Sequence, residues 1–254
     1  MKRLTVVFAV TVLIATLGSG IAFGQSSGNF SYGTSPQNEV ACTLDNSGAI
    51  SGGEQCVQSC NIDANGVSSC TPATGVCGGH AVAGIKTSSG TGNIFLVRPS
   101  AVIGLLTDVT VSSKQSGSNT GAVSSSALAG VDFKVSVTGP NGDVKVIPSD
   151  YITYDSRYIQ ISTNLFQALA STCTLIDGGC SITFNESTVS AHSFDFLAGG
   201  PVSPLSSGQY TVTTTWKPAL GGDGISRSLT CVGPLNMTVQ QNKVFSFNTI
   251  NGTP

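Results

Sequence analysis

Apolar and polar side chains alternate along two stretches of this chain with a period of two residues. Over residues 131–138, Val and Phe alternate with Asp, Lys, Ser and Thr, and over residues 210–217, Tyr, Val, Thr and Trp alternate with Thr and Lys. A period of two is typical of a β-strand that has one buried face and one face in water. Both stretches are therefore predicted to be strands at the surface of a core.

Shorter apolar and β-branched runs predict the remaining strands, which are bounded by Gly, Pro and Asn. They cover residues 93–98, 101–111, 144–146, 159–161, 182–184, 194–196, 226–240 and 243–248. Residues 112–130 are rich in Ser, Gly and Ala and predict an exposed loop, while residues 164–172 are the one stretch expected to be helical. Short strands at this spacing favour an all-β, antiparallel β-sandwich.

Residues 25–90 have a different pattern, with many cysteines and turn sequences and few large apolar residues. The segments 45–48 and 63–66 combine Asp, Asn and Gly, which tolerate the backbone conformations of tight turns. A segment with so little to bury is expected to depend on disulfides for its order. We therefore expect a Cys-rich, turn-rich segment over 25–90, followed by a β-sandwich domain over 91–254.

The first 24 residues form a signal peptide by their pattern. Lys2 and Arg3 precede an apolar run from Leu4 to Leu17, and small residues then lead to an expected cleavage site after Gly24. An uncleaved anchor is the alternative, but a spanning helix needs about 20 apolar residues and Gly18-Ser19-Gly20 interrupts this run. No later apolar run is as long, so no membrane span is expected once the signal is removed. The protein is expected to be secreted or at the cell surface, in a periplasm or outside the cell.

Eight cysteines follow the signal peptide, and an even number in an exported chain favours disulfides. They are Cys42, Cys56, Cys60, Cys70, Cys77, Cys173, Cys180 and Cys231. Five precede residue 80 and three follow residue 170. Both numbers are odd, so if every cysteine is paired, at least one disulfide must join the two regions. Zinc binding is disfavoured because the Cys56–Cys60 spacing has no second matching pair.

Two pairings of the late cysteines are considered. Cys173 and Cys180 flank Gly178-Gly179, which can turn the chain back, so the favoured pairing is local and leaves Cys231 to bond in the N-terminal cluster. The alternative joins Cys180 to Cys231 across two sheets.

The low charge of the chain argues against nucleic acid as a partner. Charged residues make up 9% of the sequence, the net charge is −2, and the 11 Lys and Arg are scattered singly. A nucleic-acid-binding protein shows a basic stripe, so nucleic acid is not an expected partner. The apolar fraction of 40% suffices for a core.

The sequence predicts no catalytic residue, metal ligand or cofactor. A Ser-His-Asp hydrolase needs a base held by a carboxylate, but there is no Gly-x-Ser-x-Gly motif, and His80 and His192 are the only histidines. His192 is expected to be an ordinary surface residue. A glycosidase needs two paired carboxylates. The carboxylates outside obvious turns are not paired along the chain: Glu39, Glu54, Glu186, Asp150, Asp155 and Asp195. The chain is expected to be non-catalytic.

Three tyrosines are the candidate binding residues. Tyr151, Tyr154 and Tyr158 cluster around Asp155-Ser156-Arg157, and aromatic platforms can stack on sugars. A regular strand would place Tyr151 and Tyr154 on opposite faces, and Tyr is common in strands, so the favoured interpretation is ordinary strand aromatics.

One stretch resembles a known family. Ser207-Gly208-Gln209-Tyr210-Thr211-Val212, followed by Trp216, resembles the penultimate strand of immunoglobulin-like domains in secreted bacterial proteins, over about residues 180–245. The resemblance implies a sandwich, although the tryptophan of immunoglobulin domains lies on an earlier strand, and a jelly-roll-like sandwich fits as well. We expect an exported, non-catalytic structural or adhesive protein. A secreted module that binds polysaccharide or protein is the alternative, and a secreted hydrolase comes third.

Overall fold

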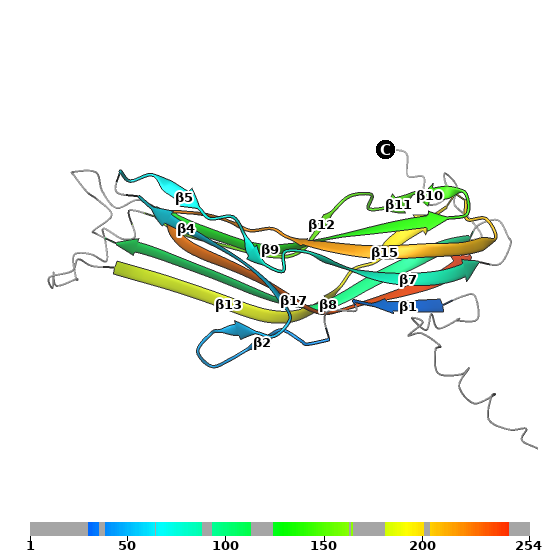
Figure 1. Ribbon diagram of the computed structural model, residues 1–254, viewed down its shortest axis with the longest axis horizontal. Helices are drawn as coiled ribbons and strands as arrows, with labels where there is room; N and C mark the ends of the chain where they lie inside the picture. The colour runs from blue at the N-terminus through cyan, green and yellow to red at the C-terminus, as the bar shows by residue number, and fades with distance from the viewer. Residues whose placement is uncertain are drawn as a thin grey trace, which may run out of the picture.

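Two antiparallel β-sheets packed face to face make up an elongated, all-β sandwich, as the sequence predicted (Figure 1). The structure is a computed structural model that describes residues 30–35, 39–63, 65–87, 93–112, 124–162, 164, 181–200 and 204–243. The expected helix over 164–172 lies outside the described residues apart from its first position.

The larger sheet has nine strands: β1 (Phe30–Thr34), β4 (Glu54–Ile62), β5 (Ser68–Cys70), β6 (Thr74–Gly75), β8 (Asn93–Ser112), β11 (Val146–Ile147), β13 (Ser181–Ser193), β14 (Phe196–Gly199) and β17 (Ile225–Lys243). The smaller sheet has six: β7 (Gly79–Thr87), β9 (Ser125–Gly139), β10 (Gly142–Val144), β12 (Ile152–Ile161), β15 (Gly208–Pro218) and β16 (Gly221–Asp223). A separate hairpin pairs β2 (Thr43–Leu44) with β3 (Ile50–Ser51).

The two longest strands, β8 and β17, pair along almost their whole length and divide the larger sheet into two halves. In the open half, β8 residues 93–99 and β17 residues 235–243 are flanked by β14 on one side and β1 on the other. In the stapled half, β8 residues 100–112 and β17 residues 225–232 are flanked by β13 and β4. A β-bulge between Val232 and Leu235 marks the boundary, and its extra residue lets both side chains face the core.

The predicted alternation is confirmed in β9 and β15. Val131, Phe133, Val135 and Val137 of β9 are all buried, and so are Tyr210, Val212, Thr214 and Trp216 of β15. Together with Phe95 and Phe196 of the larger sheet they fill the space between the sheets, where Phe95 meets Tyr210 edge to face at 5.1 Å.

The segment over 25–90 does not stand apart from the sandwich, contrary to expectation. Its strand β7 pairs with β15 of the smaller sheet, and its strand β4 pairs with β17 of the larger sheet. The boundary at residue 90 is therefore not a boundary between the sheets. The physical reason is that Ala81 and Ala83 fit into the crowded centre of the sandwich, where large side chains are not needed.

Strand β1 closes one side of the open half by lying against β7. The Ser31 hydroxyl donates to the Gly84 carbonyl oxygen at 2.6 Å. A Cβ at Gly33 would lie only 2.3 Å from the Val82 carbonyl oxygen, so this approach of two backbones requires glycine.

Three disulfides are present among the described residues: Cys42–Cys231, Cys56–Cys77 and Cys60–Cys70. The first joins the early and late cysteines, as parity required, and it rules out the alternative bond between Cys180 and Cys231. Cys173 and Cys180 lie outside the described residues, so their pairing stays a prediction.

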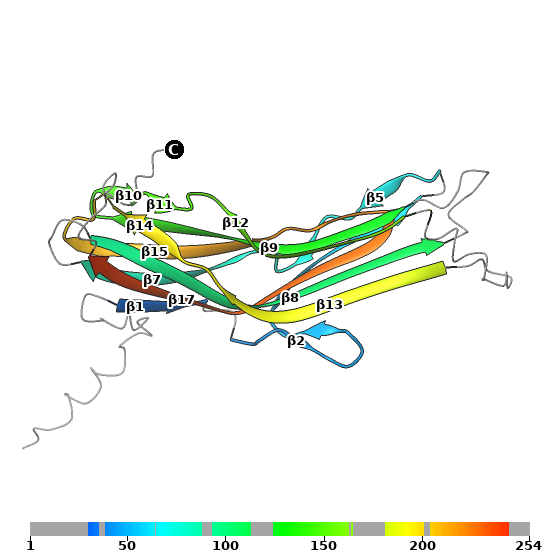
Figure 2. The same cartoon turned by 180° about the vertical axis from the view of Figure 1, so that it is seen from behind.

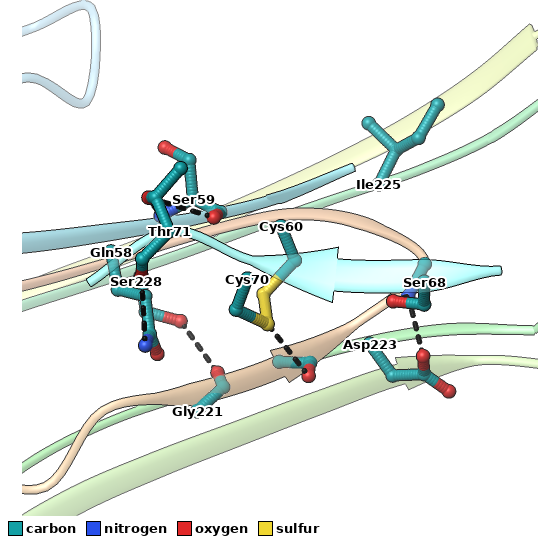
Figure 3. Close-up of a disulfide and its surroundings, with 12 residues drawn as sticks. Gln58, Ser59, Cys60, Ser68, Cys70, Thr71, Gly221, Asp223, Ile225 and Ser228 are labelled. Atoms are coloured by element: carbon teal, nitrogen blue, oxygen red, sulfur yellow. Dashed lines mark hydrogen bonds between the residues drawn. A yellow bond between two sulfur atoms is a disulfide. The ribbon is translucent and has the colours of Figure 1, made fainter. Parts of the chain in front are cut away.

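The Cys60–Cys70 disulfide lies where β4 and β5 meet β16 of the smaller sheet (Figure 3). Cys70 Sγ is 3.3 Å from the Gly222 carbonyl oxygen, and the Ser228 hydroxyl donates to the Gly221 carbonyl oxygen at 2.9 Å. These contacts fasten the edges of the two sheets to each other on one side of the stapled half.

Candidate interaction surface

The three candidate tyrosines do not form a shared platform. Tyr154 points inward, where its ring packs on Phe133 at 4.3 Å and its hydroxyl donates to the His192 carbonyl oxygen at 2.5 Å. Burial raises the pKa of Tyr154 well above its usual range. Tyr158 is 60% exposed on the opposite side of the same strand. A register shift between Thr153 and Asp155 breaks the simple parity of β12.

Tyr151 lies just before β12, beside two lysines. Lys217 Nζ is 4.2 Å and Lys134 Nζ is 5.7 Å from the centre of its ring. These cation–π contacts account for Tyr151 within the molecule itself. Tyr154 and Tyr158 lie in strand β12 and Tyr151 precedes it, so the interpretation as strand aromatics fits two of the three positions.

A serine, a histidine and an aspartate meet between the neighbouring edge strands β12 and β13, although sequence spacing gave no sign of it. Ser190 Oγ lies 2.6 Å from His192 Nε2, and Asp155 Oδ2 lies 3.1 Å from the same nitrogen. In a catalytic triad, the serine and the carboxylate bind opposite nitrogens of the imidazole. Here both meet Nε2, so Asp155 is not placed to orient His192 as a base for Ser190.

The same strand pair carries an ion pair between Arg157 of β12 and Glu186 of β13. Together with the polar contacts of His192, this ion pair joins the edges of the two sheets on the side opposite the Cys60–Cys70 disulfide. The cluster therefore has a clear structural role as a fastening between sheets.

Of the other carboxylates considered in the sequence, Asp195 and Asp150 face cations, Glu39 is exposed, and Glu54 is buried at the start of β4. Asp195 accepts two hydrogen bonds from Arg98, at 2.6 and 2.8 Å, and these bonds lower the pKa of Asp195. Asp150 lies 3.9 Å from Lys134 Nζ, and Glu39 and His80 are exposed. Within the described part of the chain, no group of three His, Cys, Asp or Glu side chains could hold a metal ion.

Two shallow hollows lie on the outer face of the stapled half, and Arg227 lines both. One, of about 180 Å³, is bounded by the hairpin, and the other, of about 260 Å³, contains Asp108. Burial raises the pKa of Asp108, and the nearby Arg227 opposes that rise. Both hollows are smaller than the roughly 300–1,000 Å³ of typical small-molecule sites, so neither favours an enclosed substrate.

The outer face of the open half carries a row of exposed side chains that crosses five strands. Ile147 of β11 pairs with Leu197 of β14, which pairs with Leu96 of β8, then Gln240 of β17 and Phe30 of β1. We call these five residues the exposed row. Phe30 is 45%, Ile147 54% and Leu197 39% exposed, and Leu96 is half-buried.

Polar groups border the exposed row on one side. In the neighbouring row, Tyr32 pairs with Thr238, which pairs with Arg98. Tyr32 is 66% exposed, and the charge of Arg98 is matched by Asp195. A mostly apolar centre with a polar border is typical of a surface that docks another surface. Sequence reasoning missed it because the members come from five separate strands.

The same face of the stapled half is already covered. Ile50 of the hairpin packs against Leu106 and Leu229, and the Cys42–Cys231 disulfide fixes the hairpin to β17. Figure 2 shows the hairpin beside β8 and β13, away from the open half. Glycine at position 104 makes room for it, since a Cβ there would lie 3.0 Å from Ile50 Cγ2.

No protein-family model matches the sequence, and no curated protein is similar to it. Among the described residues, none belongs to a helix of the length and hydropathy needed to cross a membrane.

Proposed function

We propose that this chain is an exported, non-catalytic structural or adhesive protein of the cell surface or extracellular space, and that it acts by docking through the exposed row. The observation that carries the proposal is the contrast within one sheet face. The stapled half covers its outer apolar residues with a hairpin, whereas Phe30, Ile147 and Leu197 of the open half remain 39 to 54% exposed. Contiguous exposed apolar side chains are typical of interaction sites.

Export is supported by the sequence pattern of residues 1–24 and by the disulfides. Disulfides persist in oxidising compartments and are rare in a reducing cytoplasm. The three described bonds are compatible with a protein that works outside the cytoplasm.

The geometry of the polar clusters favours a non-catalytic role. Ser190 and Asp155 both meet Nε2 of His192, and Glu186 is paired with Arg157. The two hollows beside Arg227 are shallow and small. Each cluster has a structural explanation, and we assign none of these groups a chemical step.

The resemblance to immunoglobulin-like domains remains a prediction, and one contact supports it. The Tyr210 hydroxyl donates to the Ser206 carbonyl oxygen at 2.9 Å, four residues upstream. Immunoglobulin-like domains use a similar tyrosine contact at the start of their penultimate strand.

A carbohydrate-binding module is the second candidate, and Phe30 with Tyr32 favours it. The two rings project from one face of strand β1 and are 45% and 66% exposed. Residues two apart on a strand are about 7 Å apart, which allows two rings to meet neighbouring sugar units.

Fractionation of the native host with wild-type and variant proteins tests the proposal. We expect the wild type in the cell-surface or matrix fraction on non-reducing gels and Leu197→Lys in the medium, because a charge in the row opposes docking. Tyr158→Lys places the same charge on an exposed aromatic of the other sheet and should leave the protein in place. Free wild-type protein in the medium, or retention of Leu197→Lys, would contradict the proposed function.

A further inference from the structure

We propose that the partner of the exposed row is the exposed row of a second copy of this chain, so that two molecules associate through the outer faces of their larger sheets. This inference rests on the proposed docking function and names its partner. It is carried by the charge, the strand register and the size of the surface.

The chemistry of the row excludes a charged partner surface. Its centre holds Leu96 and Leu197, with Gln240 as its polar member. The nearby cation, Arg98, is bound by two hydrogen bonds to Asp195 and so brings no unmatched charge. A complementary surface must therefore be apolar and without charge at its centre. The chain itself presents such a surface in every copy.

The shape of the row also fits a second β-sheet. Its members lie at matched register positions on five strands, so they form one line across a sheet rather than a pocket. Sheets pack face to face at about 10 Å, as the two sheets of this molecule do. On the stapled half, the hairpin already adds a third β-layer over the same face through Ile50. A second copy would supply the corresponding layer over the open half.

The size of the outer face of the open half predicts a reversible dimer. The exposed row crosses five strands about 4.8 Å apart, and residues 93–99 of β8 set the height of this face, which gives it a footprint on the order of 400 Å². Stable interfaces bury about 800 Å² per partner, and smaller ones belong to weak, transient complexes. The association should therefore appear only as protein concentration rises, with the monomer folded on its own.

Sedimentation of the oxidised, processed chain over a wide range of concentration tests the inference. We expect a monomer–dimer equilibrium for the wild type and at least a tenfold weaker association for Leu96→Lys, since two like charges would meet at the centre of the interface. Tyr158→Lys, on the other sheet, should associate as the wild type does. Circular dichroism checks that each variant is folded.

Mixing two oppositely charged variants makes the test specific for row-on-row contact. Leu96 is in the middle of the row, so a two-fold axis through its centre brings Leu96 of each copy together. Leu96→Lys and Leu96→Glu should each be monomeric alone and associate when mixed at equal concentration. A wild type that stays monomeric at every concentration, or a mixture that fails to associate while the wild type dimerises, would overturn the proposal.

The outcome separates this inference from the proposed function. If the wild type is monomeric in solution but Leu197→Lys still leaves the surface fraction, docking stands and the partner is a different molecule, so the second copy is wrong. If the wild type dimerises through the row yet is recovered free in the medium, the inference holds and the surface role is wrong.

Discussion

The stapled and open halves of the larger sheet share the strands β8 and β17 but are stabilised in different ways. In the open half, the space between the sheets is filled by large side chains that include Phe95, Phe196 and Met237. Among the described residues towards the far end of the stapled half, the buried apolar cluster consists of Val109, Val111, Ala127 and Ile161, with Ile159 and Ile182 packed against it. The stapled half, whose far end holds this smaller apolar cluster, is the half that carries the disulfides.

Buried hydroxyls replace apolar volume in the stapled half. Ser226, Ser228 and Thr230 of β17 all face inward and are buried. Thr230 donates to the Gly130 carbonyl oxygen at 3.0 Å and Ser228 donates to Gly221. Such hydrogen bonds contribute about 1 kcal/mol each, whereas a buried large apolar side chain contributes about 1.5–3 kcal/mol. The hairpin and the disulfides offset this difference.

The difference between the two cores explains why one outer face is covered and the other is exposed. The stapled half needs a second apolar cluster, so Ile50, Leu106 and Leu229 are packed together beneath the hairpin. The open half gains enough from its inner face to leave the exposed row in water. The row is thus available for docking without loss of the fold.

Truncation of the open-half core should have the largest effect. Phe95→Ala removes a fully buried ring that packs against Tyr210 and is expected to lower the free energy of unfolding by about 3–5 kcal/mol. Val109→Ala, its control in the stapled half, removes fewer buried carbons and should cost about 2 kcal/mol at most. Urea unfolding of the oxidised proteins measures both. Equal losses would show that the two cores contribute alike, and the comparison would fail.

Removal of the Cys42–Cys231 disulfide should have the next largest effect on the stability of the whole fold, and it should in addition loosen the hairpin that the bond holds. The bond closes a loop of 189 residues, so the double variant Cys42→Ala, Cys231→Ala is expected to lose about 3–5 kcal/mol through the entropy of the unfolded chain. Amide hydrogen exchange should rise most in the hairpin over residues 43–51 and least in residues 93–99 of β8. If exchange in the open half rose to the same degree, the disulfide would not stabilise the stapled half in particular, and the contrast between the halves would be wrong.

The sequence predicted the fold class and the principal strands because alternation reports directly on burial. The stretches over 131–138 and 210–217 are strands with buried alternate residues, as expected. The pattern failed where small residues fill the core. Ala127 and Ala129 are fully buried in β9, so residues 125–130 belong to a strand and not to the expected loop. Small side chains carry little hydropathy signal, although close sheet packing requires them.

The candidate surface could not be predicted because register is a property of pairing between distant segments. Phe30 and Leu197 are 167 residues apart in the sequence, yet they share the exposed row through Leu96 and Gln240. The contacts of Ser190 and His192 with Asp155 have the same origin, since β12 and β13 belong to different sheets. The parity of the cysteines predicted one long-range contact, a disulfide between the early and late regions, because a count of cysteines constrains pairing without any knowledge of register.

Two leucines on the outer face of β8 give the finest test of the comparison. Leu106 is buried beneath the hairpin and Leu96 is half-buried in the exposed row. Leu106→Ala is expected to lower the free energy of unfolding by about 2–3 kcal/mol, because it leaves a cavity beside Ile50 and Leu229. Leu96→Ala should cost about 1 kcal/mol or less in dilute solution, since its environment is already partly water.

The loss of unfolding free energy caused by Leu96→Ala should then grow as protein concentration rises. A partner that binds only the folded state adds to the apparent stability by mass action, and the wild type would gain this contribution while the variant would not. The difference for Leu106→Ala should stay constant, because its partner belongs to the same chain. Urea unfolding at several protein concentrations measures how the loss of unfolding free energy depends on concentration for each variant. If the loss caused by Leu96→Ala did not depend on concentration, the open half would be exposed to solvent and to no second copy. If the loss rose with concentration, the hairpin would cover one half and a second molecule would cover the other.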